Sequence, residues 1–138
     1  MRKKIIQNSR ILIIDDRAEN ILLLERMLKE AGYLHLRSIT DSRTALTTFS
    51  EFQPDLVAID LRMPHVDGFA LLKMLRERVP EGTFVPMLVL TADNSREAKQ
   101  EALALGAKDF VTKPIDRVET LLRIYNLLGF FPLDVSGG

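Results

Sequence analysis

Five polar side chains are the candidates for chemistry in this sequence, because each ends or directly follows a short apolar run. They are Asp15, Asp16, Asp60, Thr91 and Lys113. The run that ends at Asp60 lies between Pro54 and Pro64, which favours a buried strand over a helix. The carboxyl ends of parallel strands lie at one edge of a sheet, where ligands bind. We therefore expect these side chains to converge at that edge.

Three carboxylates at one sheet edge need a neighbouring cation, because like charges in a partly desolvated site cannot all stay ionised at low cost. Lys113 is one candidate cation, and a divalent ion is the other. Mg²⁺ prefers oxygen ligands and usually binds one or two carboxylates together with waters and phosphate oxygens. The hydroxyl of Thr91 and the ammonium of Lys113 suit the oxygens of a phosphoryl group. These residue types suit a site for a phosphoryl group, with Lys113 or a divalent ion as the compensating cation.

The overall composition argues against several other classes of protein. Nineteen basic residues balance nineteen acidic ones, so no bulk field attracts nucleic acid or an anionic membrane. The chain has no cysteine, which removes thiolate catalysis and zinc–thiolate sites and fits a reducing cytoplasm. No stretch approaches a membrane span. With 138 residues, 46% of them hydrophobic, the chain predicts one globular domain.

The elements that must position the candidate residues alternate along the chain. Four apolar runs are typical of strands and span residues 10–14, 56–60, 85–90 and 109–112, while residues 35–39 form a weaker, more polar run that predicts a strand near an edge. Apolar residues at helical spacing follow each run, within residues 21–31, 45–49, 68–78, 98–105 and 118–128. Gly32 and Ser95 are typical helix caps. The alternation predicts an α/β fold with a parallel sheet, right-handed crossovers and helices on both faces.

The motifs at the strand ends, taken in this order, resemble the receiver domain of two-component response regulators. The resemblance runs from about Arg10 to Leu128. Its motifs are Asp15-Asp16, Asp60-Leu61-Arg62-Met63-Pro64 with Asp67-Gly68, Thr91-Ala92 and Lys113-Pro114. Each motif is weak alone, but the ordered set is specific. The resemblance implies a flavodoxin-like sheet of five strands in the order 2-1-3-4-5, with five helices, and the polarity of residues 35–39 agrees with an edge strand.

The resemblance also implies an acceptor and a metal site. Asp60 is the expected phosphoacceptor and also a Mg²⁺ ligand, Asp16 is a direct Mg²⁺ ligand and Asp15 is a ligand through water. The backbone carbonyl of Arg62 is expected to complete the protein's share of the metal shell. The expected donor is a phosphohistidine on a sensor histidine kinase or a phosphotransfer protein. The chain would then be a signalling domain rather than an enzyme, apart from its own phosphorylation and slow dephosphorylation.

Three further residues are expected to read the phosphorylated state. By resemblance, Thr91 would bind a phosphoryl oxygen, Lys113 would pair with the phosphoryl group, and Phe110 holds the place of the switch aromatic. The expected readout surface is the fourth helix, fifth strand and fifth helix, which would contact an output domain or a second copy of the chain. An aromatic in a last strand is also ordinary core, and that alternative for Phe110 stays open.

The expected domain organisation is simple. We expect a short solvated arm over residues 1–9, the receiver domain over residues 10–128, and a tail or the start of a linker over residues 129–138. Residues 121–128 are apolar on more than one helix face, as in a surface that dimerises or abuts another domain. This segment also resembles receivers joined to cyclic-di-GMP phosphodiesterase or cyclase domains. A single-domain regulator is the alternative.

Three other functions fit the same residues less well. A magnesium-dependent phosphohydrolase of the haloacid-dehalogenase kind would want a second aspartate two positions after the nucleophile, where this chain has Arg62. A flavin or nucleotide binder of this fold would want a phosphate loop after the first strand, but residues 15–19 are acidic. A scaffold that works without phosphorylation is disfavoured because every expected polar position is filled.

Overall fold

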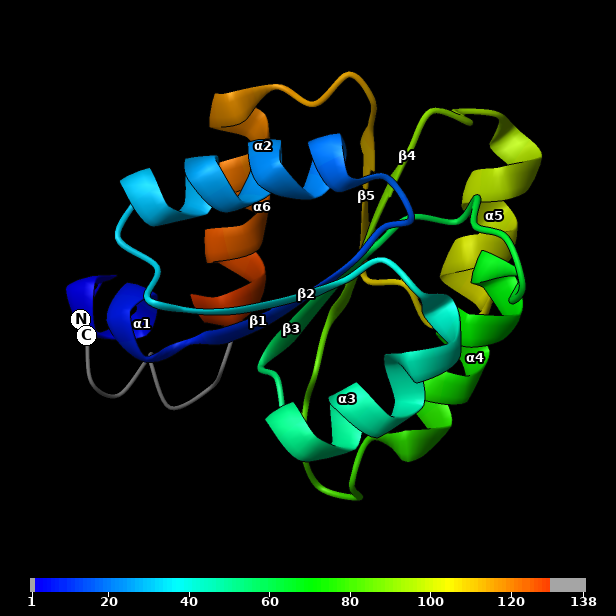
Figure 1. The fold of residues 1–138 in the computed structure, drawn as a ribbon, viewed down its shortest axis with the longest axis horizontal. Coiled ribbons are helices and arrows are strands. Elements are labelled where there is room, and N and C mark those ends of the chain that lie inside the picture. The colour runs from blue at the N-terminus through cyan, green and yellow to red at the C-terminus, as the bar shows by residue number, and fades with distance from the viewer. Residues whose placement is uncertain (1, 130–138) are drawn as a thin grey trace.

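The computed structural model describes residues 2–129, and its centre is one parallel sheet of five strands (Figure 1). The strands are β1 (Arg10–Ile14), β2 (His35–Ile39), β3 (Leu56–Ile59), β4 (Met87–Thr91) and β5 (Asp109–Thr112). Their spatial order is β2-β1-β3-β4-β5, as expected. The polar strand β2 lies at an edge, whereas β1, β3 and β4 consist almost entirely of buried residues. The polar composition of residues 35–39 thus correctly predicted that this segment is an edge strand.

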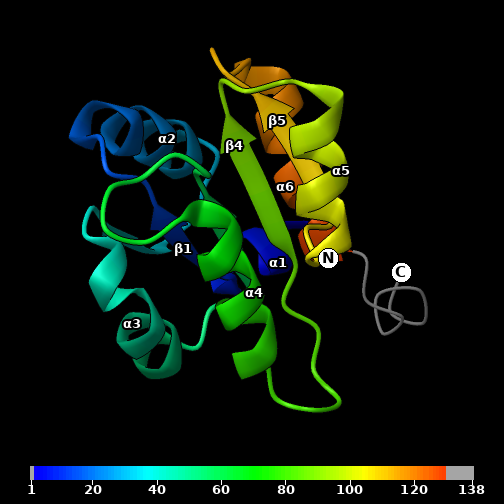
Figure 2. The same ribbon diagram turned by 90° about the vertical axis from the view of Figure 1, so that its right-hand side faces the viewer.

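Helices cover both faces of the sheet (Figures 1 and 2). They are α1 (Arg2–Asn8), α2 (Ala18–Glu30), α3 (Ala45–Phe52), α4 (Gly68–Arg78), α5 (Arg96–Ala104) and α6 (Arg117–Gly129), with a 3₁₀ helix η1 (Ser42–Thr44). Successive residues of a strand point to opposite faces. Leu12 and Ile14 of β1 thus join the apolar cluster under α3 and α4, whereas Ile11 and Ile13 join the cluster under α2 and α6.

Local signals in the sequence set several element ends. The hydroxyl of Ser95 accepts a hydrogen bond from the backbone N–H of Ala98, so the predicted cap of α5 is confirmed. Gly32 adopts a left-handed conformation, with φ +103°, directly after α2. Strand β4 begins at Met87, two residues later than predicted. Pro86 has no N–H to donate to a sheet, although its carbonyl accepts from Val57 at the margin.

The N-terminal segment contradicts the prediction of a solvated arm. Residues 2–8 form helix α1, which packs against α6. Ile5 and Ile6 are half-buried and join the apolar cluster under α2 and α6. The sequence predicts five helices and not this one, because a short polar segment is not helical by itself and its apolar partners, the turn after α2 and the end of α6, are distant in sequence.

The apolar residues of α6 are divided among three environments. Ile124 and Leu128 are buried against the sheet, Leu121 and Leu127 are half-buried, and Leu122 is exposed. The apolar residues of α6 thus lie on more than one face, as predicted, with Val118 and Leu122 exposed, and the role of the exposed residues in a contact stays a prediction. The predicted tail lies outside the described residues from position 130 onwards. No helix within residues 2–129 is long and apolar enough to cross a membrane.

Candidate functional site

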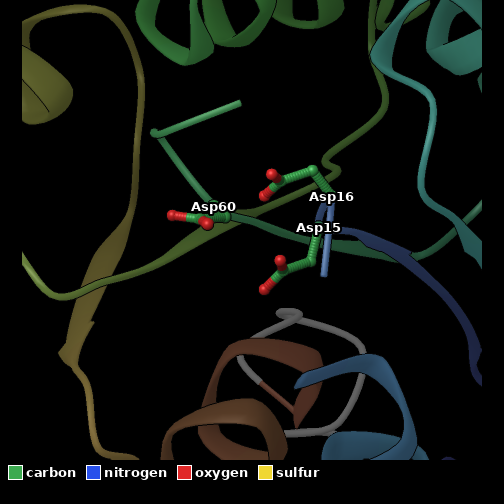
Figure 3. Close-up of side chains that lie close together, drawn as sticks. All are labelled: Asp15, Asp16 and Asp60. Atoms are coloured by element: carbon green, nitrogen blue, oxygen red, sulfur yellow. The ribbon is translucent and has the colours of Figure 1, made fainter. Parts of the chain in front are cut away.

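Three carboxylates converge at the carboxyl edge of the sheet, as the sequence predicts (Figure 3). Asp15 and Asp16 follow β1, and Asp60 follows β3, which is hydrogen-bonded to β1 along its length. One carboxylate oxygen from each residue lies within 4.8 Å of the others. Asp15 and Asp60 are buried, whereas Asp16 is half-buried. An oxygen-rich cluster of this kind has the donor atoms that a hard divalent cation prefers.

Lys113, which follows β5, supplies a cation to this cluster. Its Nζ atom lies 2.8 Å from Oδ2 of Asp15 and 3.5 Å from Oδ2 of Asp60. All three side chains are largely withdrawn from solvent, with Lys113 only 19% exposed. One ammonium therefore offsets two buried carboxylates and lies closer to Asp15. Hydrogen bonds to charged groups in such surroundings are stronger than neutral ones.

The environment of Asp60 disfavours its ionised form. Its backbone N–H donates to the carbonyl of Ile14, and its Oδ1 atom accepts from the backbone N–H of Arg62 at 3.2 Å. Burial raises the pKa of Asp60, and the charge of Asp15 adds to that effect. Lys113 and the Arg62 N–H act in the opposite direction without cancelling it. An incoming cation would therefore find an under-compensated carboxylate here.

Asp15 is held more firmly than its neighbour Asp16. The Oδ1 atom of Asp15 accepts from the backbone N–H of Arg17 at 3.0 Å and from the side-chain amide of Asn20 at 3.4 Å. Asp16 accepts no hydrogen bond from any residue in the described part of the chain. Its oxygens thus remain available to a ligand. The contribution of Asn20 was not predicted, because an asparagine in a first helical turn gives no distinctive sequence signal.

Thr91 lies on β4 and Phe110 on β5, the two strands that follow β3 in the sheet on the side away from β1. Thr91 is fully buried, and its hydroxyl accepts from the backbone N–H of Asp93 at 3.2 Å. Its carbonyl accepts from the backbone N–H of Lys113 at 2.8 Å, which ties the ends of β4 and β5 together. Phe110 is half-buried against the cluster under α3 and α4, and Nζ of Lys99 lies 5.6 Å from its ring centroid.

An ion pair that the sequence analysis missed joins two loops beside the site. The guanidinium of Arg62 lies 2.9 Å from Oδ2 of Asp93. The pKa of Asp93 is lowered by hydrogen bonds from Ser95 and by Arg62. Each partner lies two residues after a strand-end residue of the site, Asp60 or Thr91. That equal spacing is the sequence signal from which the pair could have been predicted. Arg62 is mostly exposed, and exposed pairs typically contribute less than about 1 kcal/mol.

Gly68 allows the loop after Asp60 to fold back on itself. Its N–H donates to the carbonyl of Leu61 at 3.2 Å, and Asp67 caps α4 immediately before it. A Cβ atom on Gly68 would lie 2.2 Å from that same carbonyl oxygen, too close for any side chain. The sequence motif Asp67-Gly68 thus has a steric reason, since only glycine permits this approach.

Comparisons with known proteins agree with this fold and identify its family. The family model of the response regulator receiver domain matches residues 11–125. The chain is 36% identical over 123 residues to the response regulator PleD of Caulobacter vibrioides. The aligned region covers 89% of this chain and 27% of PleD. A crystal structure of a putative response regulator from Chloroflexus aurantiacus superposes with a TM-score of 0.80 at 32% identity, covering 88% of this chain and 98% of that one.

The sheet order and the acidic cluster at its carboxyl edge agree with the family match, which is to a class of signalling domains. This chain belongs to the response regulator receiver family. A putative two-component response regulator/GGDEF domain protein is also similar, with a TM-score of 0.82 and 26% identity, over 92% of this chain and 51% of that one. The chain spans about a quarter of the length of PleD, the curated relative described above.

Proposed function

We propose that this receiver domain accepts a phosphoryl group on Asp60 from a phosphohistidine of a sensor histidine kinase or a phosphotransfer protein. The observation that carries the proposal is the convergence of Asp15, Asp16 and Lys113 on one buried carboxylate at a strand end. An isolated surface aspartate would have neither the compensating cation nor the paired carboxylates. The proposal makes the domain a phosphoacceptor and not an enzyme that turns over small phosphoesters.

In this proposal, the side chains of the site divide the work of transfer. A carboxylate oxygen of Asp60 attacks phosphorus in line, the bond from phosphorus to the donor atom breaks, and an acyl phosphate forms. The Arg62 N–H holds Oδ1 of Asp60, which orients the group for attack. Lys113 lies within 3.5 Å of Oδ2 of Asp60 and neutralises charge as the phosphoryl group arrives.

The acidic cluster fits a magnesium ion as the cofactor. The donor set of Asp15, Asp16 and Asp60 consists only of oxygens, two of the three residues are buried, and Asp16 has no competing hydrogen bond within the described residues. When bound, Mg²⁺ would supply charge neutralisation to the phosphoryl oxygens. The carbonyl of Arg62 stays a predicted further ligand. Lys113 already contacts Asp15 and would share that carboxylate with the ion.

Phosphorylation is proposed to change the surface of α5, β5 and α6, the fourth helix, fifth strand and fifth helix expected from the sequence. Thr91 would give up its hydrogen bond from Asp93 and turn its hydroxyl toward the phosphoryl oxygen. Phe110 would then repack into the space beside Thr91. Support for this step is the burial of Thr91 and the partial burial of Phe110 on the adjacent strand.

The output and the partners are also proposals. We infer that the domain controls an attached or partner output domain, and the likeness to a response regulator/GGDEF protein makes cyclic-di-GMP turnover one such output. Contact with a second copy through α5, β5 and α6 is a further predicted mode of output. The cytoplasmic location expected from the sequence stays a prediction.

Intact mass spectrometry tests the proposed phosphorylation directly. The protein is incubated with Mg²⁺ and acetyl phosphate, and wild type is compared with Asp60→Asn. We expect one added phosphoryl group in the wild type, none in Asp60→Asn, and none in the wild type when EDTA replaces Mg²⁺. Asp41→Asn is the matched control, since it makes the same chemical change at a helix cap away from the site.

Two outcomes would count against the proposal. A phosphoryl group that still appears in Asp60→Asn would mean that another residue is the acceptor. If the wild type gains no mass while a known receiver domain is labelled under the same conditions, the chain is a scaffold that works without phosphorylation. The proposed switch roles of Thr91 and Phe110 would then be withdrawn.

A further inference from the structure

Helix α1 lies outside the part of the chain that matches the family. The family model begins at residue 11 and ends at residue 125, whereas α1 spans Arg2–Asn8 and α6 continues to Gly129. These two additions pack against each other (Figure 1). They lie at the sheet edge opposite the acidic cluster, where β1 begins. The contact therefore joins two segments that lie outside the residues matched by the family model.

The position of α1 is fixed by its connection to the sheet. Ser9 is the only residue between α1 and β1, and it is 8% exposed. Both the N–H and the hydroxyl of Ser9 donate to the carbonyl of Ile5. Strand β1 pairs with β2 on one side and β3 on the other, so it is a rigid base. A helix joined so closely to a central strand has little freedom to move away.

The apolar side of α1 contacts the end of α6 and the turn after α2. Cδ1 of Ile5 lies 3.8 Å from the position that a Cβ atom would take on Gly129. Cγ2 of Ile6 lies 3.2 Å from the corresponding position on Gly32. The neighbouring side chains Leu127 and Leu128 belong to the same apolar cluster. The two isoleucines thus bridge an early turn and the last turn of the domain.

We propose that α1 is a clasp, formed by Ile5 and Ile6, that holds the C-terminal end of α6 against the body of the domain. The clasp fixes the position of Gly129, the last residue of α6. Helix ends fray easily when no tertiary contact covers them. With the clasp in place, a movement of α6 reaches the following residues as movement of one intact helix. This inference goes beyond the proposed phosphorylation and does not depend on it.

Hydrogen–deuterium exchange of the full chain tests the clasp. The double variant Ile5→Ser/Ile6→Ser removes the apolar contacts, and Lys4→Ser/Gln7→Ser is the matched control at two exposed positions of the same helix. We expect amides in residues 124–129 to exchange about tenfold faster in the Ile5/Ile6 variant, the change that about 1.4 kcal/mol of lost local stability produces. The control should exchange as the wild type does.

Each alternative result overturns the clasp. Unchanged exchange in residues 124–129 would mean that α6 holds its end without α1. Faster exchange that extends equally through β1 and β3 would mean that α1 belongs to the common core and does not act locally. A control variant as fast as the Ile5/Ile6 variant would assign the effect to helix propensity. Phosphorylation of Asp60, measured separately by mass, should be the same in all three proteins.

Discussion

The carboxyl ends and the amino ends of the parallel strands have opposite effects on the stability of the fold. At the carboxyl edge, the ends of β1 and β3 carry buried carboxylates that repel one another and share a single lysine. At the opposite edge, α1, the end of α6 and the turn at Tyr33 form an apolar contact. The first arrangement costs folding free energy that a ligand can return, whereas the second stabilises the fold without any ligand. The acidic cluster therefore opposes folding, whereas the contact between α1 and α6 favours it.

The largest expected effect comes from removing the only lysine that contacts the described acidic cluster. Without a divalent ion, Lys113→Met should lower the free energy of unfolding by about 2 kcal/mol, because two buried carboxylates lose their partner in a partly solvated site. Urea denaturation in EDTA measures the loss. Addition of Mg²⁺ should recover most of it through binding to the folded state. Lys108→Met, an exposed lysine near Phe84, is the control, and an equal loss there would remove the distinction between the edges.

A smaller effect of opposite sign is expected from neutralising Asp60, the proposed acceptor. The pKa of Asp60 is raised in the folded state, so the folded protein binds that proton more tightly than the unfolded chain does. Proton binding to Asp60 therefore stabilises the folded state below the ordinary carboxyl pKa. This stabilisation is lost as the pH rises through the raised pKa of Asp60. Asp60→Asn in EDTA should therefore be more stable than wild type by about 1 kcal/mol at pH 7, and nearly equal to it below about pH 4.

Asp41 supplies the contrasting case for the same measurement. Its pKa is lowered to about 2 by hydrogen bonds from Arg43, so its charge favours the folded state above the ordinary carboxyl pKa. Asp41→Asn should therefore give no gain in stability at pH 7. A gain as large as that of Asp60→Asn would show that loss of any acidic charge stabilises the chain, and the special cost at the carboxyl edge would be disproved.

The smallest effect is expected at the opposite edge. The Tyr33 hydroxyl is buried and has no hydrogen-bond partner in the described part of the chain, and burial raises its pKa to about 12. Tyr33→Phe should thus change the free energy of unfolding by less than about 0.5 kcal/mol at pH 7. Between about pH 10 and 12 the wild type should lose stability relative to the variant. Urea denaturation at pH 7 and pH 11 measures both values, and a loss above about 1 kcal/mol at pH 7 would reveal a hydrogen bond.

The sheet and the acidic cluster were predictable because both depend on local patterns. Each buried strand is a short apolar run, and the polarity of residues 35–39 identifies the edge strand. Once the strands are parallel, their ends must share an edge, so the meeting of Asp15, Asp16 and Asp60 follows from their positions alone. Asp15 and Asp60 can therefore be predicted to meet although about forty-five residues separate them in the sequence.

The parts that escaped prediction depend on contacts between distant segments. Ile5 is half-buried because α6 packs against α1, so the sequence of α1 read alone suggests solvent exposure. The pairing of Arg62 with Asp93 depends on how two loops bend toward each other. The preference of Lys113 for Asp15 over Asp60 is a matter of 0.7 Å, the difference between 2.8 and 3.5 Å, which side-chain packing decides.

The single lysine in the cluster also has a consequence for ion selectivity. With all three aspartates ionised, one ammonium leaves a formal charge of −2 at the carboxyl edge. A potassium or sodium ion would halve that charge, whereas one divalent ion cancels it. In a partly desolvated pocket, the residual charge matters more than it would in water. The count of charges, set by three aspartates and Lys113, thus favours divalent ions over the far more abundant monovalent ions of a cell.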